Sequence, residues 1–258
     1  MADMTFWDHL DALRKHLFRC GLVLLVLFGI FFAMMPDIFD TVVMGPCFGD
    51  FPTYRWMCRM SPAFCDQDFQ LAVVNIQLTS PFMVHLKMSL LFALTLGLPY
   101  LLFEVWRFIA PALYQSEKSA AIKAFLLSTL LFYLGILLGY FIIFPITLRF
   151  LAGYQLSSLI GNQLSFDSYI QTFTWLNFML GLAFELPVLS VILSKMGLLN
   201  KQLLRKYRRH AIVVLVIVSA IVTPTGDPFT LALVSVPLIL LYEFSIALIR
   251  DDKEIHES

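Results

Sequence analysis

The sequence has 258 residues, of which 59% are hydrophobic and 14% charged, and its mean hydropathy is +0.81. Soluble domains are about half apolar and a quarter charged, so this composition excludes an ordinary water-soluble protein. The formal net charge is zero, and no excess of positive charge indicates a nucleic-acid partner. We therefore expect an all-α integral membrane protein embedded in the lipid bilayer.

The first apolar block covers residues 20–35 and follows basic residues, as a signal peptide would. However, three aspartates also precede the block, and it ends at Pro36 without a small-residue cleavage site. We therefore predict a retained first span at 17–35. Apolar residues also recur at helical spacing before it, which predicts an amphipathic helix at the membrane surface. These residues are Phe6, Leu10, Leu13 and Leu17.

Six apolar runs can cross the bilayer as helices, because about 20 helical residues cover about 30 Å of hydrocarbon. The fifth run, 211–223, is short, so we extend its helix through the headgroup layer from residue 208. A single transmembrane domain is expected, with a long outer loop at 36–79. The predicted spans are 17–35, 81–106, 120–146, 173–193, 208–223 and 229–249.

The distribution of Lys and Arg sets the orientation, because positively charged loops remain in the cytoplasm. Of the 18 basic residues, 14 lie in the N-terminal segment, the loops after spans two and four, and the C-terminal tail. Three lie in the alternate loops, and Lys87 lies inside span two. This alternation predicts six spans with both termini in the cytoplasm. Without the fifth span, the basic loop after span four and the tail would lie on opposite sides.

Three of the four cysteines lie in the predicted outer loop, namely Cys47, Cys58 and Cys65. An oxidising compartment would permit one disulfide there and leave one thiol. All three pairings stay open, as does the alternative that the cysteines are buried or merely tolerated. We expect no metal site, because no histidine lies nearby.

Ionisable groups inside spans cost about 2.5 to 3.5 kcal/mol each, so they usually face protein or a wet cavity. Glu185 lies in mid-span, two residues before Pro187, which should kink the helix because it cannot donate a hydrogen bond to the preceding turn. The Glu185 carboxyl either holds a polar group or water in the interior or is a neutral acid bonded to a neighbouring helix. Lys87, Glu104 and Glu243 lie nearer span ends, where we expect snorkelling to the interface.

Motifs of common enzyme classes are absent from the sequence. It has no H-E-x-x-H zinc motif, no phosphate-binding G-x-x-x-x-G-K-[ST] loop and no G-x-S-x-G nucleophile turn. We therefore expect no enzyme, no catalytic residue and no cofactor.

Five stretches of the sequence are distinctive when taken together. They are residues 6–14 before the first span, 80–82 with Lys87 at the start of the second, 108–117 after it, 184–188 in the fourth, and Thr223, Pro224, Asp227 and Pro237 around the last outer turn. In this order they resemble the TatC family, the multispanning signal-receptor subunit of the twin-arginine protein translocase. The resemblance implies the glove-like TatC fold in the cytoplasmic (inner) membrane, with short fifth and sixth helices.

The resemblance also implies a receptor and core subunit that binds twin-arginine signal peptides and organises the export of folded proteins. Two adjacent guanidiniums are best met by carboxylates in bidentate geometry. The family has one carboxylate in the loop after span two, matching Glu117, for which an ordinary solvated carboxylate is the alternative. It has another in the N-terminal motif, where this sequence has Ala12. Asp8, about 40° from Ala12 around a helix, is a better substitute than Asp11, about 100° away. The other signal-peptide contacts that the resemblance implies are His9, Leu10, Arg14, Phe108 and Pro111.

The partners implied by the resemblance are single-span subunits of the TatA and TatB types, with several copies of the chain in a larger complex driven by the proton gradient. Glu185 matches the family's intramembrane glutamate, while Pro46 and Asp227 would shape the outer face. A competing hypothesis is a small-solute or ion transporter with Glu185 and Lys87 as pathway groups. It lacks visible repeated halves and leaves the match at 108–117 unexplained. A membrane scaffold that binds no signal is a third class.

Overall fold

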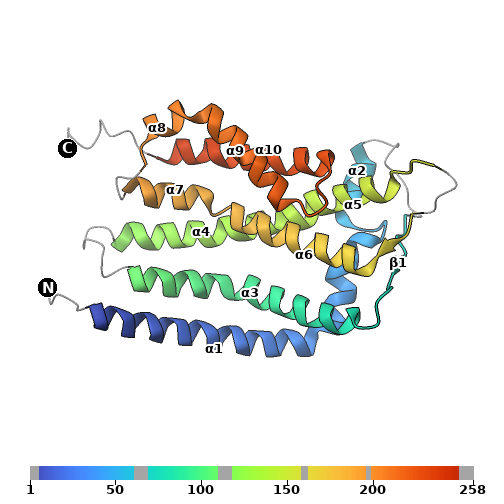
Figure 1. Cartoon of the computed structure of the whole chain (residues 1–258), viewed down its shortest axis with the longest axis horizontal. Coiled ribbons are helices and arrows are strands. Elements are labelled where there is room, and N and C mark those ends of the chain that lie inside the picture. The colour runs from blue at the N-terminus through green and yellow to red at the C-terminus, as the bar shows by residue number, and fades with distance from the viewer. Residues whose placement is uncertain (1–5, 61–68, 110–117, 158–161, 196–198, 250–258) are drawn as a thin grey trace. The chain divides into compact units, whose positions relative to one another are not determined.

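The computed structural model describes residues 6–60, 69–109, 118–157, 162–195 and 199–249, which are mostly helical (Figure 1). The chain forms two compact units. Unit 1 comprises Met1–Phe39 and Pro81–Leu130, and unit 2 comprises Asp40–Ser80 and Leu131–Ser258. Each unit is described by itself below.

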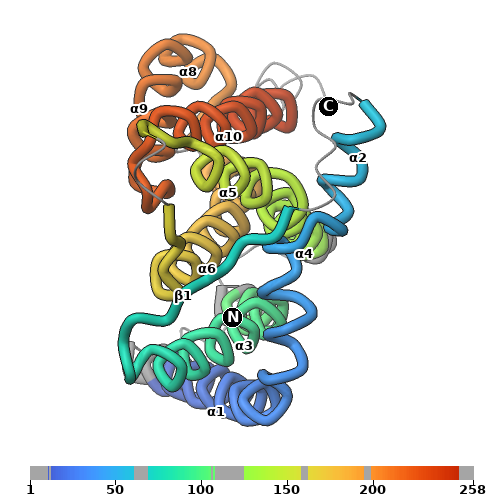
Figure 2. The backbone as a smooth tube through the Cα atoms, turned by 90° about the vertical axis from the view of Figure 1, so that its right-hand side faces the viewer, coloured from blue at the N-terminus to red at the C-terminus, as the bar shows by residue number. Residues whose placement is uncertain are grey.

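Unit 1 is built from helices α1 (Phe6–Ile38) and α3 (Ser80–Ile109) and the first part of α4 (Lys118–Leu138). The α1 and α3 helices lie side by side (Figures 1 and 2). Phe31 packs on Phe92, whereas Glu104 contacts His16 near the other end, so the two helices are antiparallel. At Gly97 an added Cβ would lie 3.0 Å from a Leu24 methyl, which shows how closely the two helices approach.

The α1 helix runs without a break through both the predicted surface segment and the predicted first span. Its 33 residues correspond to about 50 Å of helix, which exceeds the roughly 30 Å of the hydrocarbon core. No glycine or proline lies between residues 6 and 20 to end the helix. The amphipathic segment therefore continues straight from the membrane-spanning segment and is not a separate surface helix.

Unit 2 begins with short elements and then contains most of the remaining helices. The first are the π-helical turn η1 (Phe39–Val43), the 3-10 turn η2 (Gly45–Cys47), helix α2 (Pro52–Met60) and strand β1 (Val73–Val74). The end of α4 leads through the π-helical turn η6 (Gly139–Ile143) into α5 (Phe144–Gly153) and strand β2 (Leu164–Ser165). The last helices are α6 (Phe166–Ala183), α7 (Leu186–Lys195), α8 (Lys201–Lys206), α9 (Arg208–Val222) and α10 (Pro228–Leu248).

The two strands form a small parallel pair, in which Val73 is opposite Leu164 and Val74 is opposite Ser165. The second strand leads directly into α6, whose N-cap is Ser165. The Ser165 hydroxyl accepts a hydrogen bond from the backbone N–H of Ser168 and so satisfies one free donor of the first turn. This cap begins α6 seven residues before the predicted start of the fourth span at 173.

The core of unit 2 lies where the end of α4 and η6 meet α6. An added Cβ at Gly135 would lie 2.8 Å from the carbonyl oxygen of Leu180, and one at Gly181 would lie 2.8 Å from Ile136 Cγ1. Real Cβ contacts are longer than this, so both positions require glycine for the helices to pack so closely. Phe132, which also touches Gly181, is fully buried at 0% exposure.

The predicted kink in the fourth span is confirmed as a break in the helix. The α6 helix ends at Ala183 and α7 begins at Leu186, with Phe184 and Glu185 in the turn between them. Pro187 lies in the first turn of α7, where its missing N–H costs least.

Five segments of the described chain are long and apolar enough to span a membrane. They are Leu13–Cys47, Ser80–Val105, Phe125–Gly153, Phe166–Ser194 and Pro228–Leu248. The remaining span, fifth in chain order, is α9, which has only 15 residues and is shorter than the other five. The fold is therefore a mostly helical membrane fold of six spans with a short fifth helix. The cytoplasmic position of both termini follows from the distribution of Lys and Arg.

Candidate functional site

The cytoplasmic ends of α1 and α3 are joined by a buried carboxylate. Glu104 is only 3% exposed. Its Oε2 contacts Nδ1 of His16 on α1, and its Oε1 accepts a hydrogen bond of 2.9 Å from the Tyr100 hydroxyl, one turn earlier on α3. The expectation that Glu104 snorkels to the interface is therefore wrong. The physical reason is that a partner on the neighbouring helix satisfies the carboxylate inside the unit, so it does not need to reach water.

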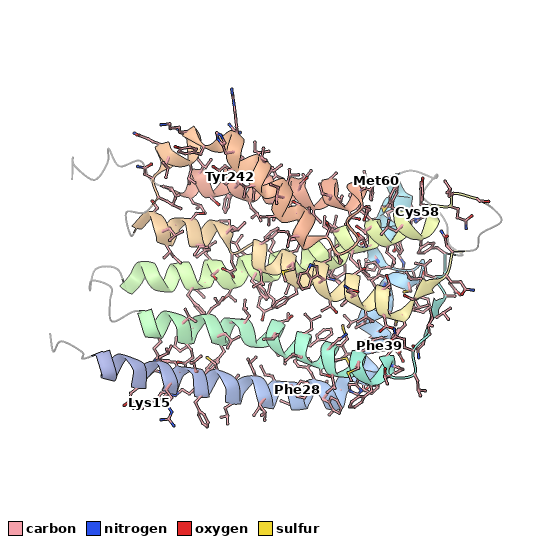
Figure 3. All side chains as sticks on the ribbon, viewed as in Figure 1. Lys15, Phe28, Phe39, Cys58, Met60 and Tyr242 are labelled. Carbon is pink, nitrogen blue, oxygen red and sulfur yellow. The ribbon has the colours of Figure 1, made fainter. Side chains whose placement is uncertain are left out.

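The predicted N-terminal signal-binding residues lie on the first turns of α1, beyond His16 toward the cytoplasm. Asp11 and Arg14 are exposed. Asp8, His9 and Leu10 are helical, but their side chains are outside what the structure describes. Figure 3 shows Lys15 on the face of α1 turned away from α3, whereas the next residue, His16, contacts Glu104 on α3.

The other half of the predicted site follows the end of α3. Phe108 lies in the last turn of that helix, whereas Pro111 and Glu117 are outside the described residues. Because α1 and α3 are antiparallel and meet at the His16–Glu104 contact, residues before 16 and after 104 extend toward the same end of unit 1. The structure thus brings the start of α1 and the end of α3 together, as a site built from both would require.

Glu185 occupies the turn between α6 and α7 in unit 2. Its backbone N–H donates to the Leu182 carbonyl at 3.1 Å, and its own carbonyl accepts from Leu189 N–H at 3.0 Å. The residue is partly buried, and its Oε1 atom is enclosed. The break in the helix therefore places a carboxyl group in a turn between two halves of the fourth predicted span.

Lys87 lies in the third turn of α3, in unit 1, and is exposed. An exposed lysine near a span end can place its ammonium group at the interface while its stem covers apolar surface. Snorkelling of Lys87 to the interface stays a prediction.

The outer end of unit 2 is held by an aromatic and cationic stack. The Tyr54 hydroxyl donates to the carbonyl of Pro46 at 3.0 Å and to that of Pro145 at 3.2 Å. The Arg149 guanidinium lies 5.6 Å from the Tyr54 ring centroid and 5.4 Å from that of Phe69, within the range of cation–π attraction. Burial raises the pKa of Tyr54 well above its ordinary value, so its hydroxyl stays protonated and remains a donor. Pro46 is thus one anchor of this outer loop.

The cysteines of the outer loop have different states. Cys58, on α2 beside Met60 (Figure 3), is disulfide-bonded. Cys47 is a buried free thiol, 1% exposed. The prediction that concerns Cys65 lies outside the described residues. Because Cys58 is in a disulfide, the alternative that all three cysteines are buried or merely tolerated does not hold.

Asp227 begins the last helix as its N-cap. Its Oδ1 accepts from Thr230 N–H at 2.7 Å, and its Oδ2 accepts from the Thr225 hydroxyl. Partial burial opposes ionisation, but these hydrogen bonds outweigh it and lower the pKa of Asp227 below its ordinary value. Gly226, with φ at +61°, supplies the left-handed turn that delivers the chain to this cap.

Sequence reasoning missed the partnership of His16 and Glu104. The sequence did contain a signal that Glu104 needs a partner, because a glutamate in an apolar span requires a polar group nearby. His16 was a candidate, since it lies one helical turn after Ala12 on the same face of α1. The pairing itself joins residues 88 positions apart, a separation that no local pattern specifies.

Comparisons with known proteins agree with this architecture. Residues 8–237 match the family model described as Sec-independent protein translocase protein (TatC). Proteins of the same name from Aquifex aeolicus and Escherichia coli K12 are 33% and 32% identical, over 99% and 92% of this chain and 100% and 85% of their own lengths. A crystal structure of the twin-arginine translocase receptor TatC in DDM superposes with a TM-score of 0.76 at 33% identity, covering 94% of this chain and 99% of the other. The chain therefore belongs to the TatC family of multispanning membrane proteins.

Proposed function

We propose that this chain is the receptor and core subunit of a twin-arginine translocase in the cytoplasmic membrane. In this role it binds twin-arginine signal peptides and organises the export of folded proteins. The observation that carries the proposal is the similarity to the twin-arginine translocase receptor over 94% of the chain. Membership of a translocase family supports a role in transport and gives no indication of catalysis.

The signal site is proposed at the cytoplasmic ends of α1 and α3. Twin arginines present two permanent charges that carboxylates can meet in bidentate pairs. Glu117, in the segment after α3, and Asp8, in the first turn of α1, are the proposed carboxylates. His9, Leu10 and Arg14 on α1, with Phe108 and Pro111 after α3, would complete the walls. The support is that the start of α1 and the end of α3 lie at the same end of unit 1.

Site-specific crosslinking in membrane vesicles tests this site. A twin-arginine signal should crosslink to the wild-type protein, and replacing the pair by Lys-Lys should remove the product. We expect Asp8→Ala combined with Glu117→Ala to abolish crosslinking, whereas Asp11→Ala should have a weaker effect because its side chain lies about 100° from position 12. Equal crosslinking by the wild type and the double variant would contradict the proposed carboxylates.

The partners proposed for this subunit are single-span proteins of the TatA and TatB types, in a complex that contains several copies of this chain. Glu185 would offer such a helix a polar contact from the break between α6 and α7. The support is physical, because an ionisable residue in the middle of a span is costly to insert and commonly marks a functional site. All six spans are proposed to act as one transmembrane domain.

A further inference from the structure

Ala12 stands where the resemblance implies a carboxylate, and the structure places another carboxylate, Glu104, against His16, which lies one turn farther along α1. His16 lies one turn after Ala12 on α1, about 6 Å farther along the helix axis. Side chains on a helix lean toward its N-terminus, so the imidazole of His16 lies over the turn that contains Ala12. Because Nδ1 of His16 contacts Oε2 of Glu104, the Glu104 carboxylate is held against the face of α1 that carries Ala12.

Among the described residues, the groups hydrogen-bonded to Glu104 carry no permanent charge, and the Arg19 guanidinium on α1 acts on its carboxylate through electrostatic attraction. Glu104 accepts hydrogen bonds from Tyr100, which is neutral, and from His16, which carries a charge only when protonated. A buried carboxylate is stabilised more by a permanently charged, hydrogen-bonding group than by neutral donors. The side chain of His16 is 17% exposed, so the pair reaches the surface on the His16 side. A long guanidinium side chain could approach from there.

We propose that Glu104 is an additional carboxylate of the twin-arginine site, supplying from α3 the charge that position 12 of α1 lacks. Tyr100 and His16 hold its two oxygens in place. This inference rests on the proposed function, because it assigns a further binding residue to the same site. It goes beyond that function by placing one acidic determinant inside α3, in addition to Asp8 on α1 and Glu117 in the segment after α3.

The competing explanation is that the contact only fastens α1 to α3. The two roles respond differently to Glu104→Gln, because glutamine keeps the volume and an acceptor for Tyr100 but loses the charge. They also respond differently to a new carboxylate at position 12. Ala12→Glu restores negative charge beside the site without restoring the contact between the helices.

The experiment measures binding of a twin-arginine peptide, and of its Lys-Lys counterpart, to the purified full-length chain in detergent. The variants are Glu104→Gln, Ala12→Glu and the two combined. Glu243→Gln is the matched control, because Glu243 pairs with Arg208 on another part of the chain. We expect Glu104→Gln to weaken twin-arginine binding by about tenfold or more, as loss of a charge-assisted hydrogen bond does. The combined variant should return to within about threefold of the wild type, and the control should not change.

Two results would overturn the inference while leaving the proposed function standing. One is unchanged binding by Glu104→Gln; the other is weakened binding that Ala12→Glu does not restore, since that outcome assigns Glu104 to fastening alone. If the wild type does not prefer the twin-arginine peptide over the Lys-Lys peptide, both proposals fail.

The Ala12→Glu variant provides an independent check if Glu104→Gln does not fold, because it removes no buried group. Its affinity should stay within about threefold of the wild type, since the site already has the charge. A gain of about tenfold would show that the charge was missing and would contradict the role of Glu104.

Discussion

Replacement of Gly135 by alanine should separate α4 from α6. The added Cβ would lie 2.8 Å from the Leu180 carbonyl oxygen and 2.8 Å from Cγ of Phe184. Carbon contacts are normally about 3.5 to 4.0 Å, so one helix must shift by about 0.7 Å or more. The obstructing atom belongs to the backbone, which cannot rotate away as a flexible side chain could. Gly135→Ala also places strain next to the turn that carries Glu185.

The expected magnitude follows from two opposing terms. Overpacking of this kind costs about 1 to 3 kcal/mol, while alanine in a helix interior is favoured over glycine by about 1 kcal/mol. The net loss in free energy of unfolding should therefore be about 1 to 2 kcal/mol. The matched control is Gly29→Ala in α1, where nothing lies within 4 Å of the added Cβ. That control keeps the propensity gain alone and should be neutral or stabilising.

Denaturant and thermal unfolding of the purified variants in detergent measure the difference directly. Gly135→Ala should unfold at lower denaturant concentration and lower temperature than the wild type, and Gly29→Ala should not. If both variants were equally stable, the close packing of α4 on α6 would be refuted as the reason for glycine at position 135.

Three further predictions concern other parts of the chain. Glu185→Ala should insert and fold normally but lose co-purification with the single-span partners; retained co-purification and normal export would rule out the proposed contact. Tyr54→Phe should lower the free energy of unfolding by about 1 to 2 kcal/mol, because two acceptors lose their donor, whereas Tyr154→Phe, at an exposed position, should have no effect on the same measurement. For Asp227 the depressed pKa means that the ionised cap stabilises the folded state above the ordinary value of 3.8 and that this contribution disappears as the pH falls through the folded-state pKa. The stability advantage of the wild type over Asp227→Asn should therefore shrink between pH 7 and pH 3 in unfolding experiments, and a gap independent of pH would contradict the assigned hydrogen bonds.

Local signals were sufficient for the features that depend on one segment. The apolar runs and the alternation of basic loops predicted six spans, and Pro187 predicted the break at Phe184 and Glu185. The helix boundaries were less predictable, because caps and turns extend helices past the apolar run. The third membrane segment continues through Pro145 to Gly153, since a proline in the first turn of α5 does not interrupt the helix.

Contacts between distant segments could not be predicted in the same way. Glu104 was expected to reach toward water because it lies near the end of its predicted span. Its burial depends on His16, which α1 supplies once it packs antiparallel to α3. Likewise, the position of Arg149 between Tyr54 and Phe69 follows from the folding of the outer loop onto α5. Such pairings require the tertiary arrangement and not only helical periodicity.

The central claim is that the chain recognises a pair of arginines. The most direct measurement is the ratio of affinities of the purified protein for a twin-arginine signal peptide and for the same peptide with the pair changed to Lys-Lys. Lysine keeps the charge but cannot form the bidentate pairs of a guanidinium, so we expect the twin-arginine peptide to bind at least about tenfold more tightly. Equal affinity for the two peptides would contradict the claim.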